Sequence, residues 1–163
     1  MAMTINTEGL TEVSQMLERL GNQAEAVASG ALYDGAGVVA DAMSAAVEKI
    51  VSKPTRFYAV EGHFVRYPTD AEKNALRGKV GIARFNKNGS EVDTLVGMAK
   101  NAGYAEIDGK QKPIAEIARS IESGTSFMKK QPVFRRAANQ SRSKAEAAIV
   151  AKAEQMLNEI INE

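Results

Sequence analysis

Two long, alanine-rich helical patterns constrain the fold of this chain more than any other feature of its sequence. From about Thr7 to Lys49, apolar residues recur at intervals of three and four, which is the spacing of one helix face. From Pro132 almost to the last of the 163 residues the same spacing returns, with alanine as the commonest residue. Alanine favours a helix but fills little volume, so we expect partners to pack closely against both helices. We also expect a break or kink near Gly21, because glycine weakens a helix.

A β-hairpin is expected in the middle of the chain. Residues 79–85 and 91–98 alternate as strands do, and Asn86–Gly89 between them is rich in residues that favour a turn. A third strand is expected at residues 103–107, before a turn at Asp108-Gly109. Strands joined by such short turns pair in the antiparallel sense.

Shorter elements are expected on either side of this hairpin. Residues 52–78 are irregular, with an aromatic, β-prone stretch around Glu61–His63 and a short helix capped by Thr69. After the hairpin, Pro113 is well placed in the first turn of another short helix, and Gly124 is well placed to end it.

Together these elements predict an α+β fold. We expect an antiparallel, β-hairpin-centred sheet packed against a long N-terminal helix and a long C-terminal helix. The length suits one domain, residues 1–163, since single cores typically span about 100–200 residues. The chain has no cysteine, so its core is expected to form without disulfides, as a chain of this size can.

Charge is distributed unevenly along the chain although the net charge is only +1. Residues 1–50 carry a net charge of −5, residues 51–136 carry +7, and residues 137–163 carry −1. These segments are either the solvated faces of separate elements or the complementary faces of a subunit that meets other copies of itself. In the second case, the acidic N-terminal helix of one copy is expected near the basic middle segment of the next.

The inventory of reactive side chains argues against catalysis. His63 is the only histidine, and no nucleophile-elbow motif accompanies it. Asp34 and Asp41 are two helical turns apart, without the dense oxygen ligands of a calcium loop. Gly35 and Gly37 lie inside a helical pattern rather than between a strand and a helix, so they do not predict a phosphate loop. We therefore expect no enzyme, no cofactor and no metal site.

Membrane insertion is not expected. No apolar run approaches the roughly 20 residues that span a bilayer, and the first residues lack the basic and apolar design of a signal peptide. We therefore expect a protein made in the cytoplasm and without a membrane partner.

A basic cluster in the last third of the chain is open to two interpretations. Lys129, Lys130, Arg135 and Arg136 flank the segment 132–134. They could contact the phosphates of a nucleic acid. Alternatively, they form a basic loop and first helical turn that pair with acidic groups of a neighbour. The second interpretation is favoured because a dedicated nucleic-acid binder is usually strongly basic overall.

The most distinctive stretch of the sequence joins the last two helical patterns. In it, Glu122, Gly124 and Thr125 are followed by Pro132 and Phe134. Gly124 permits a sharp reversal, Thr125 and the serine after it can bond carbonyls freed at the helix end, and Pro132 restarts a helix. We expect Phe134 to anchor this reversal on the hairpin. Each of these roles forms the fold, and none is catalytic.

This stretch, residues 117–126 followed by 131–137, resembles the signature of a tail-component family of tailed double-stranded DNA phages, often called the gene-product-ten family. In that family a glutamate and a glycine-threonine pair precede a helix that starts with proline, phenylalanine and arginine. Residues 31–40 look like the family's second helical segment, and residues 75–78 like the turn before its hairpin. The resemblance spans residues 10–160.

The chain also departs from the family pattern. Ser123 stands where the family has an aromatic residue, and the threonine-glycine before the Leu76-Arg77 pair is missing. Residues 56–68 look like an insertion. These departures leave the resemblance to the family in place and bear on which role within the family the chain has.

The resemblance implies a structural virion protein at the head–tail junction or tail end. It implies a ring of identical subunits, a hexamer, that completes the tail and joins it to the head, assembled in the host cytoplasm. The implied partners are head-completion or connector proteins and the tail-tube protein, with passing contact to DNA in the ring lumen. Glu122, Gly124, Thr125, Pro132 and Phe134 would form its structural motif. The remaining motif residues are expected where copies meet, namely Arg135 and Arg136.

Two alternatives accompany this hypothesis. Within the same class, the chain could be a minor tail or tail-terminator protein. From a different class, it could be a small nucleic-acid-binding protein that uses the basic middle segment. A large, defined oligomer favours the ring, and salt-sensitive DNA binding by a monomer favours the nucleic-acid binder.

Overall fold

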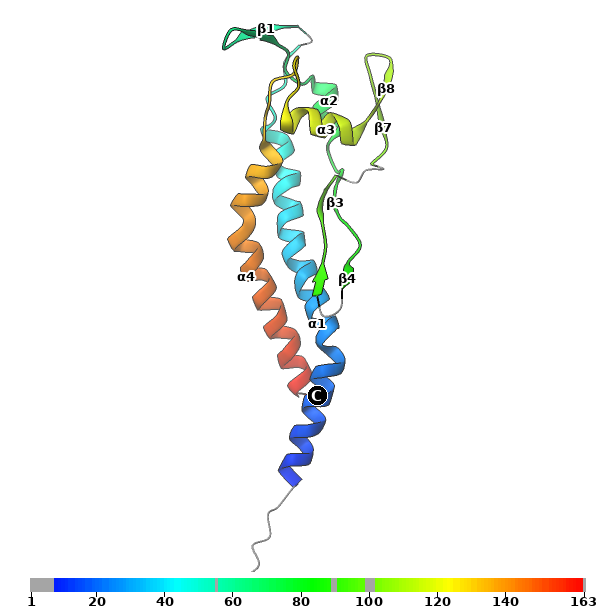
Figure 1. Ribbon diagram of the computed structural model, residues 1–163, viewed down its shortest axis with the longest axis vertical. Helices are drawn as coiled ribbons and strands as arrows, with labels where there is room; N and C mark the ends of the chain where they lie inside the picture. Colours follow the sequence, from blue (N-terminus) through cyan, green and yellow to red (C-terminus); the bar gives the residue numbers. More distant parts are fainter. Residues whose placement is uncertain (1–7, 55, 89–90, 99–101, 163) are drawn as a thin grey trace, which may run out of the picture.

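Two long helices run side by side and in opposite directions along an elongated molecule (Figure 1). The computed structural model describes residues 8–54, 56–88, 91–98 and 102–162. Helix α1 spans Glu8–Ala46 and continues into the 3-10 helix η1, Val47–Lys49; helix α4 spans Val133–Asn162. The first turns of α1 extend beyond the last turns of α4. Both long helices expected from the sequence are therefore present.

The two helices approach closely through small residues, as their alanine and glycine content predicted. A Cβ atom built on Gly35 would collide with the side chain of Ile149 and lie 3.1 Å from the carbonyl oxygen of Ala145. The break expected near Gly21 is absent, because α1 is one unbroken helix from Glu8 to Ala46. One glycine costs a helix only about 1 kcal/mol, which the surrounding helix formers and the packing of α1 offset.

The strands form four two-stranded antiparallel ladders instead of one larger sheet. A shorter helix, α2, follows the first ladder, and α3 follows the last. The bounds are β1 (Tyr58–Val60) with β2 (His63–Val65), β3 (Val80–Ile82) with β6 (Val96–Met98), β4 (Asn86–Asn88) with β5 (Glu91–Asp93), and β7 (Tyr104–Ile107) with β8 (Lys110–Pro113); α2 is Asp70–Ala75 and α3 is Ile114–Ser123.

The hairpin expected in the middle of the chain is confirmed, with one correction. Residues 86–88, expected as part of the turn, are strand β4, paired with β5, and Gly89 lies outside the described residues. Pairing with the opposite strand therefore outweighs the turn preference of the two asparagines. Between the β3–β6 and β4–β5 ladders, the amide of Ala83 donates to the carbonyl of Leu95 at 2.8 Å, so the arms stay together.

The other short elements follow their local sequence signals. Thr69 caps α2: its hydroxyl accepts from the amide of Glu72 at 3.2 Å, and the Glu72 carboxylate accepts from the amide of Thr69 at 3.0 Å. The strand expected at residues 103–107 is β7, and Asp108 in its turn has a positive φ. Pro113 immediately precedes α3.

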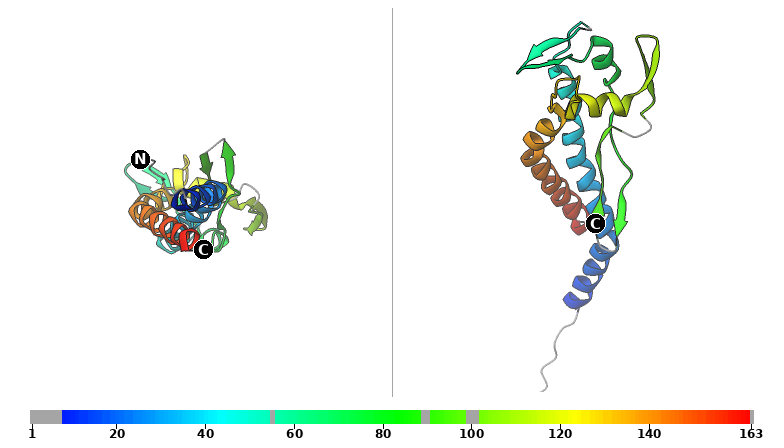
Figure 2. Two further views of the ribbon diagram at one scale, coloured as in Figure 1. Left: turned by 90° about the horizontal axis from the view of Figure 1, so that it is seen from below. Right: turned by 45° about the horizontal axis from the view of Figure 1, so that its top comes forward.

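The main core lies at one end of the helix pair, where α2, α3 and the β7–β8 hairpin meet η1 and the start of α4. The central hairpin, which contains β3 and β6, and helix α4 lie on different sides of α1 (Figure 2). The α+β class is confirmed. The buried members of the core are Val47, Ile50, Leu76, Ile107, Ile114, Ile117, Ala118, Ile121, Met128 and Phe134.

Candidate functional site

The connection between α3 and α4, residues 122–136, contains the whole sequence motif. Glu122 lies in the last turn of α3, and its two carboxylate oxygens accept from the amides of Phe134 and Arg135, each at 3.0 Å. These amides belong to the first turn of α4, where N–H groups have no partner within the helix. Glu122 therefore caps α4 from the preceding helix, and its negative charge lies at the positive end of the helix dipole.

Gly124 ends α3 and reverses the chain, as expected. Its φ is +73°, which favours glycine, and its amide donates to the carbonyl of Ser120 at 2.9 Å. A Cβ atom at this position would lie 2.9 Å from Cβ of Lys130 and 3.1 Å from its backbone nitrogen. Both the backbone angle and the close return of the chain therefore require glycine.

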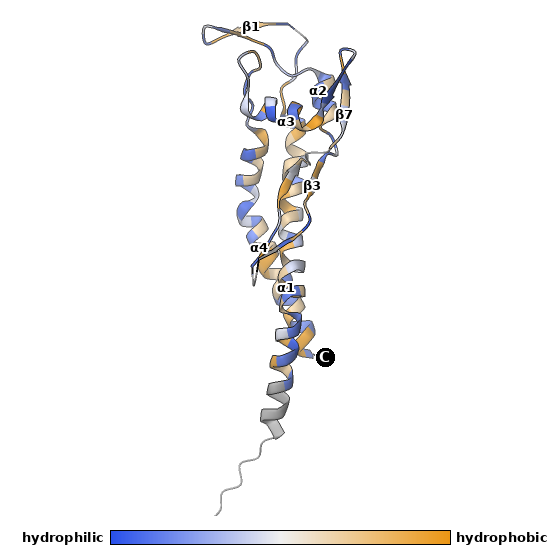
Figure 3. Ribbon diagram, turned by 45° about the vertical axis from the view of Figure 1, so that its right-hand side comes forward, coloured by the Kyte–Doolittle hydropathy of each residue, from blue (hydrophilic) through white to orange (hydrophobic). Residues whose placement is uncertain are grey.

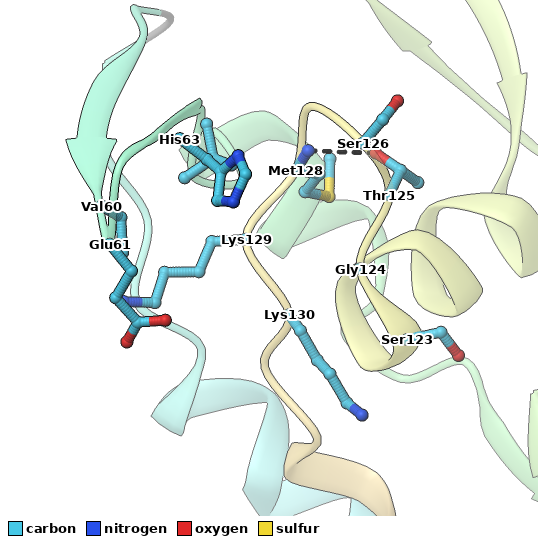
Figure 4. A pocket seen from close by; sticks show the side chains of 11 residues that line it. Val60, Glu61, His63, Ser123, Gly124, Thr125, Ser126, Met128, Lys129 and Lys130 are labelled. Atoms are coloured by element: carbon cyan, nitrogen blue, oxygen red, sulfur yellow. Dashed lines mark hydrogen bonds between the residues drawn. The ribbon is translucent and has the colours of Figure 1, made fainter.

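The loop after Gly124 is closed by Thr125, though differently from our expectation. The Thr125 hydroxyl accepts from the amide of Met128 at 3.0 Å instead of donating to a freed carbonyl (Figure 4). The amide of Thr125 in turn donates to the carbonyl of Met128 at 3.1 Å. The hydroxyl satisfies loop amides because the four residues from 125 to 128 form a tight turn. Ser126 is exposed.

Gln131 is a structural residue that the sequence did not single out. Its side-chain amide bonds both backbone groups of Val51: Nε2 donates to the carbonyl at 2.9 Å, and Oε1 accepts from the amide at 2.8 Å. The segment after η1 is thereby fastened to the α3–α4 connection. Pro132 follows directly, and α4 begins at the next residue, as the sequence predicted.

Phe134 is buried in the main core, with 7% of its surface exposed. That core is formed mainly by α3, the end of α1 with η1, and α2. The expectation that Phe134 anchors the reversal on the central hairpin needs correction, because that hairpin contributes only Met98, at the partly buried edge of the core. Arg135 and Arg136, which follow Phe134, are both exposed.

The β1–β2 hairpin is joined to the α3–α4 connection by backbone pairing. The amide of Arg66 donates to the carbonyl of Phe127 at 2.8 Å, and the amide of Lys129 donates to the carbonyl of Arg66 at 2.9 Å. Together they form a parallel bridge between Arg66 and Met128. The hairpin and the connection therefore form one end of the molecule (Figure 1).

The buried side chain of Glu72 joins several elements at this end of the molecule. It is 2% exposed, and its carboxylate accepts a two-pronged bond from the guanidinium of Arg66 at 2.7 and 2.8 Å, with the ammonium of Lys112 at 3.5 Å. Burial raises the pKa of Glu72, but the hydrogen bonds from Arg66 and the amide of Thr69, with the nearby positive charges, outweigh burial and hold this pKa below its ordinary value.

An open cavity of about 720 Å³ separates the β1–β2 turn from the α3–α4 connection (Figure 4). His63 lines it with Glu61 and Lys129 on one side, and Thr125 lies opposite. In the part of the chain that the structure describes, no hydrogen bond joins His63 to an acid, and no cluster of three potential metal-ligating side chains occurs. The cavity is a recess between the β1–β2 turn and the α3–α4 connection.

A second cleft, of about 370 Å³, lies on the neighbouring face of the same end. Lys129, Lys130 and Arg136 of the basic cluster line it, whereas Arg135 does not. Two further cations, Lys49 and Lys53, come from the segment around the end of η1. No local pattern predicts this meeting, because the two segments are joined by long-range contacts such as the bonds of Gln131 to Val51.

Comparison with known proteins finds no matching family model, no matching curated protein and no matching solved structure. Among the described residues, none of the helices is both long and apolar enough to cross a membrane. The geometry described above is therefore the basis on which a function is inferred.

Proposed function

We propose that this chain is a structural virion protein, a subunit that assembles as a ring to complete a phage tail and join it to the head. The resemblance of residues 117–137 to the phage tail-component family supports this proposal. So does the way that stretch is built: Glu122, Gly124 and Phe134 each hold the connection between the two C-terminal helices. The Glu122 carboxylate and the Phe134 ring are both engaged in contacts that hold the fold.

The observation that carries the proposal is the set of unpaired strand edges. Among the described residues, every strand pairs with only one other strand. An isolated two-stranded hairpin is marginally stable, and its outer edges offer unpaired N–H and C=O groups. A neighbouring copy that adds a strand to such an edge would satisfy both needs.

Large exposed apolar side chains on these hairpins also support assembly through the hairpins. Phe64 on β2 is 72% exposed, Leu95 between β5 and β6 is 77% exposed, and Tyr104 on β7 is 69% exposed. Figure 3 shows hydrophobic residues on the β1 hairpin, which projects from the end of the helix pair. Exposed apolar groups beside unpaired strand edges are typical of surfaces that another chain covers.

The projecting part of α1 offers a further contact surface. These turns extend past α4 (Figure 1), and Leu17 within them is 60% exposed. In a ring of such subunits, the ends that carry the hairpins would pack against one another. The mechanism is then assembly: the ring caps the tail tube and presents a docking surface to the head.

The two phage alternatives share this mechanism of assembly. A minor tail or tail-terminator protein would also form a ring, and would differ in the neighbours that its two faces meet. The nucleic-acid-binding alternative is favoured by a separate observation, the cationic cleft beside the start of α4.

The proposal is tested by measuring the mass of the purified chain with light scattering and imaging it by negative-stain electron microscopy. We expect a closed ring, a hexamer by the family resemblance. Phe64→Ser should shift the protein to monomers without lowering the melting temperature of the monomer, since this side chain is already exposed.

A matched control is Val150→Ser, an exposed apolar residue on α4 away from the hairpins. It should leave the ring intact. A chain that stays monomeric at every concentration, or a ring that Phe64→Ser leaves unchanged, would contradict the proposed assembly through the hairpins.

A further inference from the structure

The cleft between the end of η1 and the start of α4 is lined by ten residues, of which half are cationic and none is acidic. The five cations come from three separate segments of the chain. Two of them lie near the end of η1, two in the α3–α4 connection, and one in the first turn of α4: Lys49, Lys53, Lys129, Lys130 and Arg136.

Acidic groups near this end of the molecule are engaged elsewhere. Glu48 forms an ion pair with Arg77 at 2.7 Å, and that hydrogen bond lowers the pKa of Glu48. Glu122 caps α4, and Asp70 accepts a hydrogen bond from Ser52. Glu61 lines the adjoining cavity together with Lys129, but no ion pair joins them. Within the described residues, none of the five cations of the cleft forms an ion pair, so their mutual repulsion is uncompensated.

Two of the lysines are held in place by an aromatic ring. The ammonium nitrogen of Lys53 lies 4.2 Å from the centroid of Tyr67, and that of Lys129 lies 5.6 Å from the same centroid. Tyr58 packs edge-on against Tyr67 and also receives Lys53, at 4.7 Å. The aromatic pair therefore gathers positive charge at the mouth of the cleft without neutralising it.

The helix terminus beside the cleft adds no free donors of its own in its first turn. The amides of Phe134 and Arg135 are already bonded to Glu122. The attraction for an anion therefore comes from the five side chains. Four of these are lysines, and each ammonium is a flexible point charge that can meet a separate anionic group.

Two polyanions could occupy the cleft, the acidic helix α1 of a second copy or a nucleic acid. The spacing of their negative charges distinguishes them. The exposed acids in the body of α1 are far apart: Glu18, Glu25, Asp34 and Asp41 follow one another at intervals of at least seven residues, which is about 10 Å along a helix. One strand of DNA carries a phosphate about every 3.4 Å of helix axis. A second copy could thus place one or two carboxylates in the cleft, whereas a nucleic acid could meet most of its cations.

We propose that this cleft binds the phosphate backbone of a nucleic acid without reading its sequence. The contacts are charge to charge, so binding weakens as salt rises. The inference goes beyond ring assembly and does not depend on it, because every cation of the cleft comes from one chain.

The test is the fluorescence anisotropy of a labelled short DNA duplex of mixed sequence, and of its single strand, titrated with the full chain over a range of salt. If all five cations contact phosphates, the slope of log affinity against log salt is about −4.5 for the duplex and about −3.5 for the single strand. Lys49→Glu/Arg136→Glu should make this slope shallower by about 2 and lower affinity at least tenfold. The matched control is Lys110→Glu/Arg119→Glu, which makes the same charge change at exposed residues outside the cleft.

We expect the control to change affinity less than about threefold, because distant exposed charges are screened. Absence of binding to both DNA probes would overturn the proposal, and so would equal losses in the two double variants. A third contrary outcome is that the cleft variant binds DNA as tightly as wild type does but no longer forms the oligomer, which would assign the cleft to the acidic helix of a second copy. A monomer that binds DNA through the cleft would uphold this inference and refute the ring, so the two proposals fail separately.

Discussion

The carboxylate of Glu122 accepts a hydrogen bond from the amide of Phe134, although the two residues belong to different helices. Oε2 of Glu122 lies 3.0 Å from that amide, and Oε1 lies at the same distance from the amide of Arg135. One side chain at the end of α3 thus starts α4, and it does so across the glycine reversal at Gly124. The geometry of the connection is therefore coupled to the stability of the longest C-terminal element.

Replacement of this cap should weaken the fold. Glu122→Ala leaves two amides of α4 without an acceptor and is expected to lower the free energy of unfolding by about 1–2 kcal/mol. Glu122→Gln keeps one carbonyl acceptor and should lose less. Urea unfolding followed by circular dichroism measures both. Equal stability of Glu122→Ala and wild type would show that water replaces the carboxylate at no cost.

Phe134→Ala should cost more, because it removes a large side chain from the main core. The residue is 7% exposed, and such truncations typically lower the free energy of unfolding by about 3–5 kcal/mol. Phe64→Ala is the matched control, since that ring is 72% exposed; in the monomer it should change stability by less than about 0.5 kcal/mol. Similar denaturation midpoints for the two variants would contradict the burial of Phe134.

The sequence predicted the elements whose signals are local. Both long helices follow from apolar spacing, the cap of α2 from Thr69, and the end of α3 from Gly124, because each depends on neighbours within a few residues. The prediction for Asn86–Asn88 was wrong, because these residues favour a turn but pair with β5 as a strand. Whether strands join into one sheet depends on packing, which no local pattern records.

The candidate site was predictable in part for the same reason. The motif residues were identified from the order of glycine, threonine, proline and phenylalanine, but the capping role of Glu122 spans twelve positions, beyond the usual capping signature of three. The cationic cleft was predictable only in part. Three of its cations belong to the basic cluster that the sequence shows, whereas Lys49 and Lys53 join them through long-range contacts such as the bonds of Gln131 to Val51, which leave no periodic signal.

Replacing glycine by alanine should change the stability of the protein in opposite directions at two positions of α1. Gly35→Ala places a methyl group against Ile149 and the carbonyl of Ala145, and overpacking of this kind costs about 1–3 kcal/mol. Gly37→Ala meets nothing within 4 Å, so it should raise stability by about 0.5–1 kcal/mol through helix propensity. Thermal melts of the two variants measure the difference, and a common direction of change would contradict the close approach at Gly35.

The buried carboxylate of Glu72 should make stability depend on pH in a specific window. Its pKa in the folded chain is lower than the ordinary value of 4.5, so the unfolded chain takes up this proton first as pH falls. The stability that Glu72 provides is therefore complete above about pH 5 and declines as pH falls below its unfolded pKa and through its folded pKa. At pH 7, Glu72→Gln should lose about 3 kcal/mol, because Arg66 and Lys112 are left beside a neutral group.

Denaturation of wild type and Glu72→Gln in parallel from pH 7 to pH 3 measures this dependence. The gap between their free energies of unfolding should narrow steadily once pH falls below about 4.5, since the wild-type carboxylate then becomes protonated and loses its ion pairs. Glu106→Gln, at an exposed position on β7, controls for general effects of removing one acid and should stay within about 0.5 kcal/mol of wild type at pH 7. A gap between wild type and Glu72→Gln that is constant across this range would mean that the pKa of Glu72 is the same in the folded and unfolded chains, and that its bonds to Arg66 contribute through packing alone.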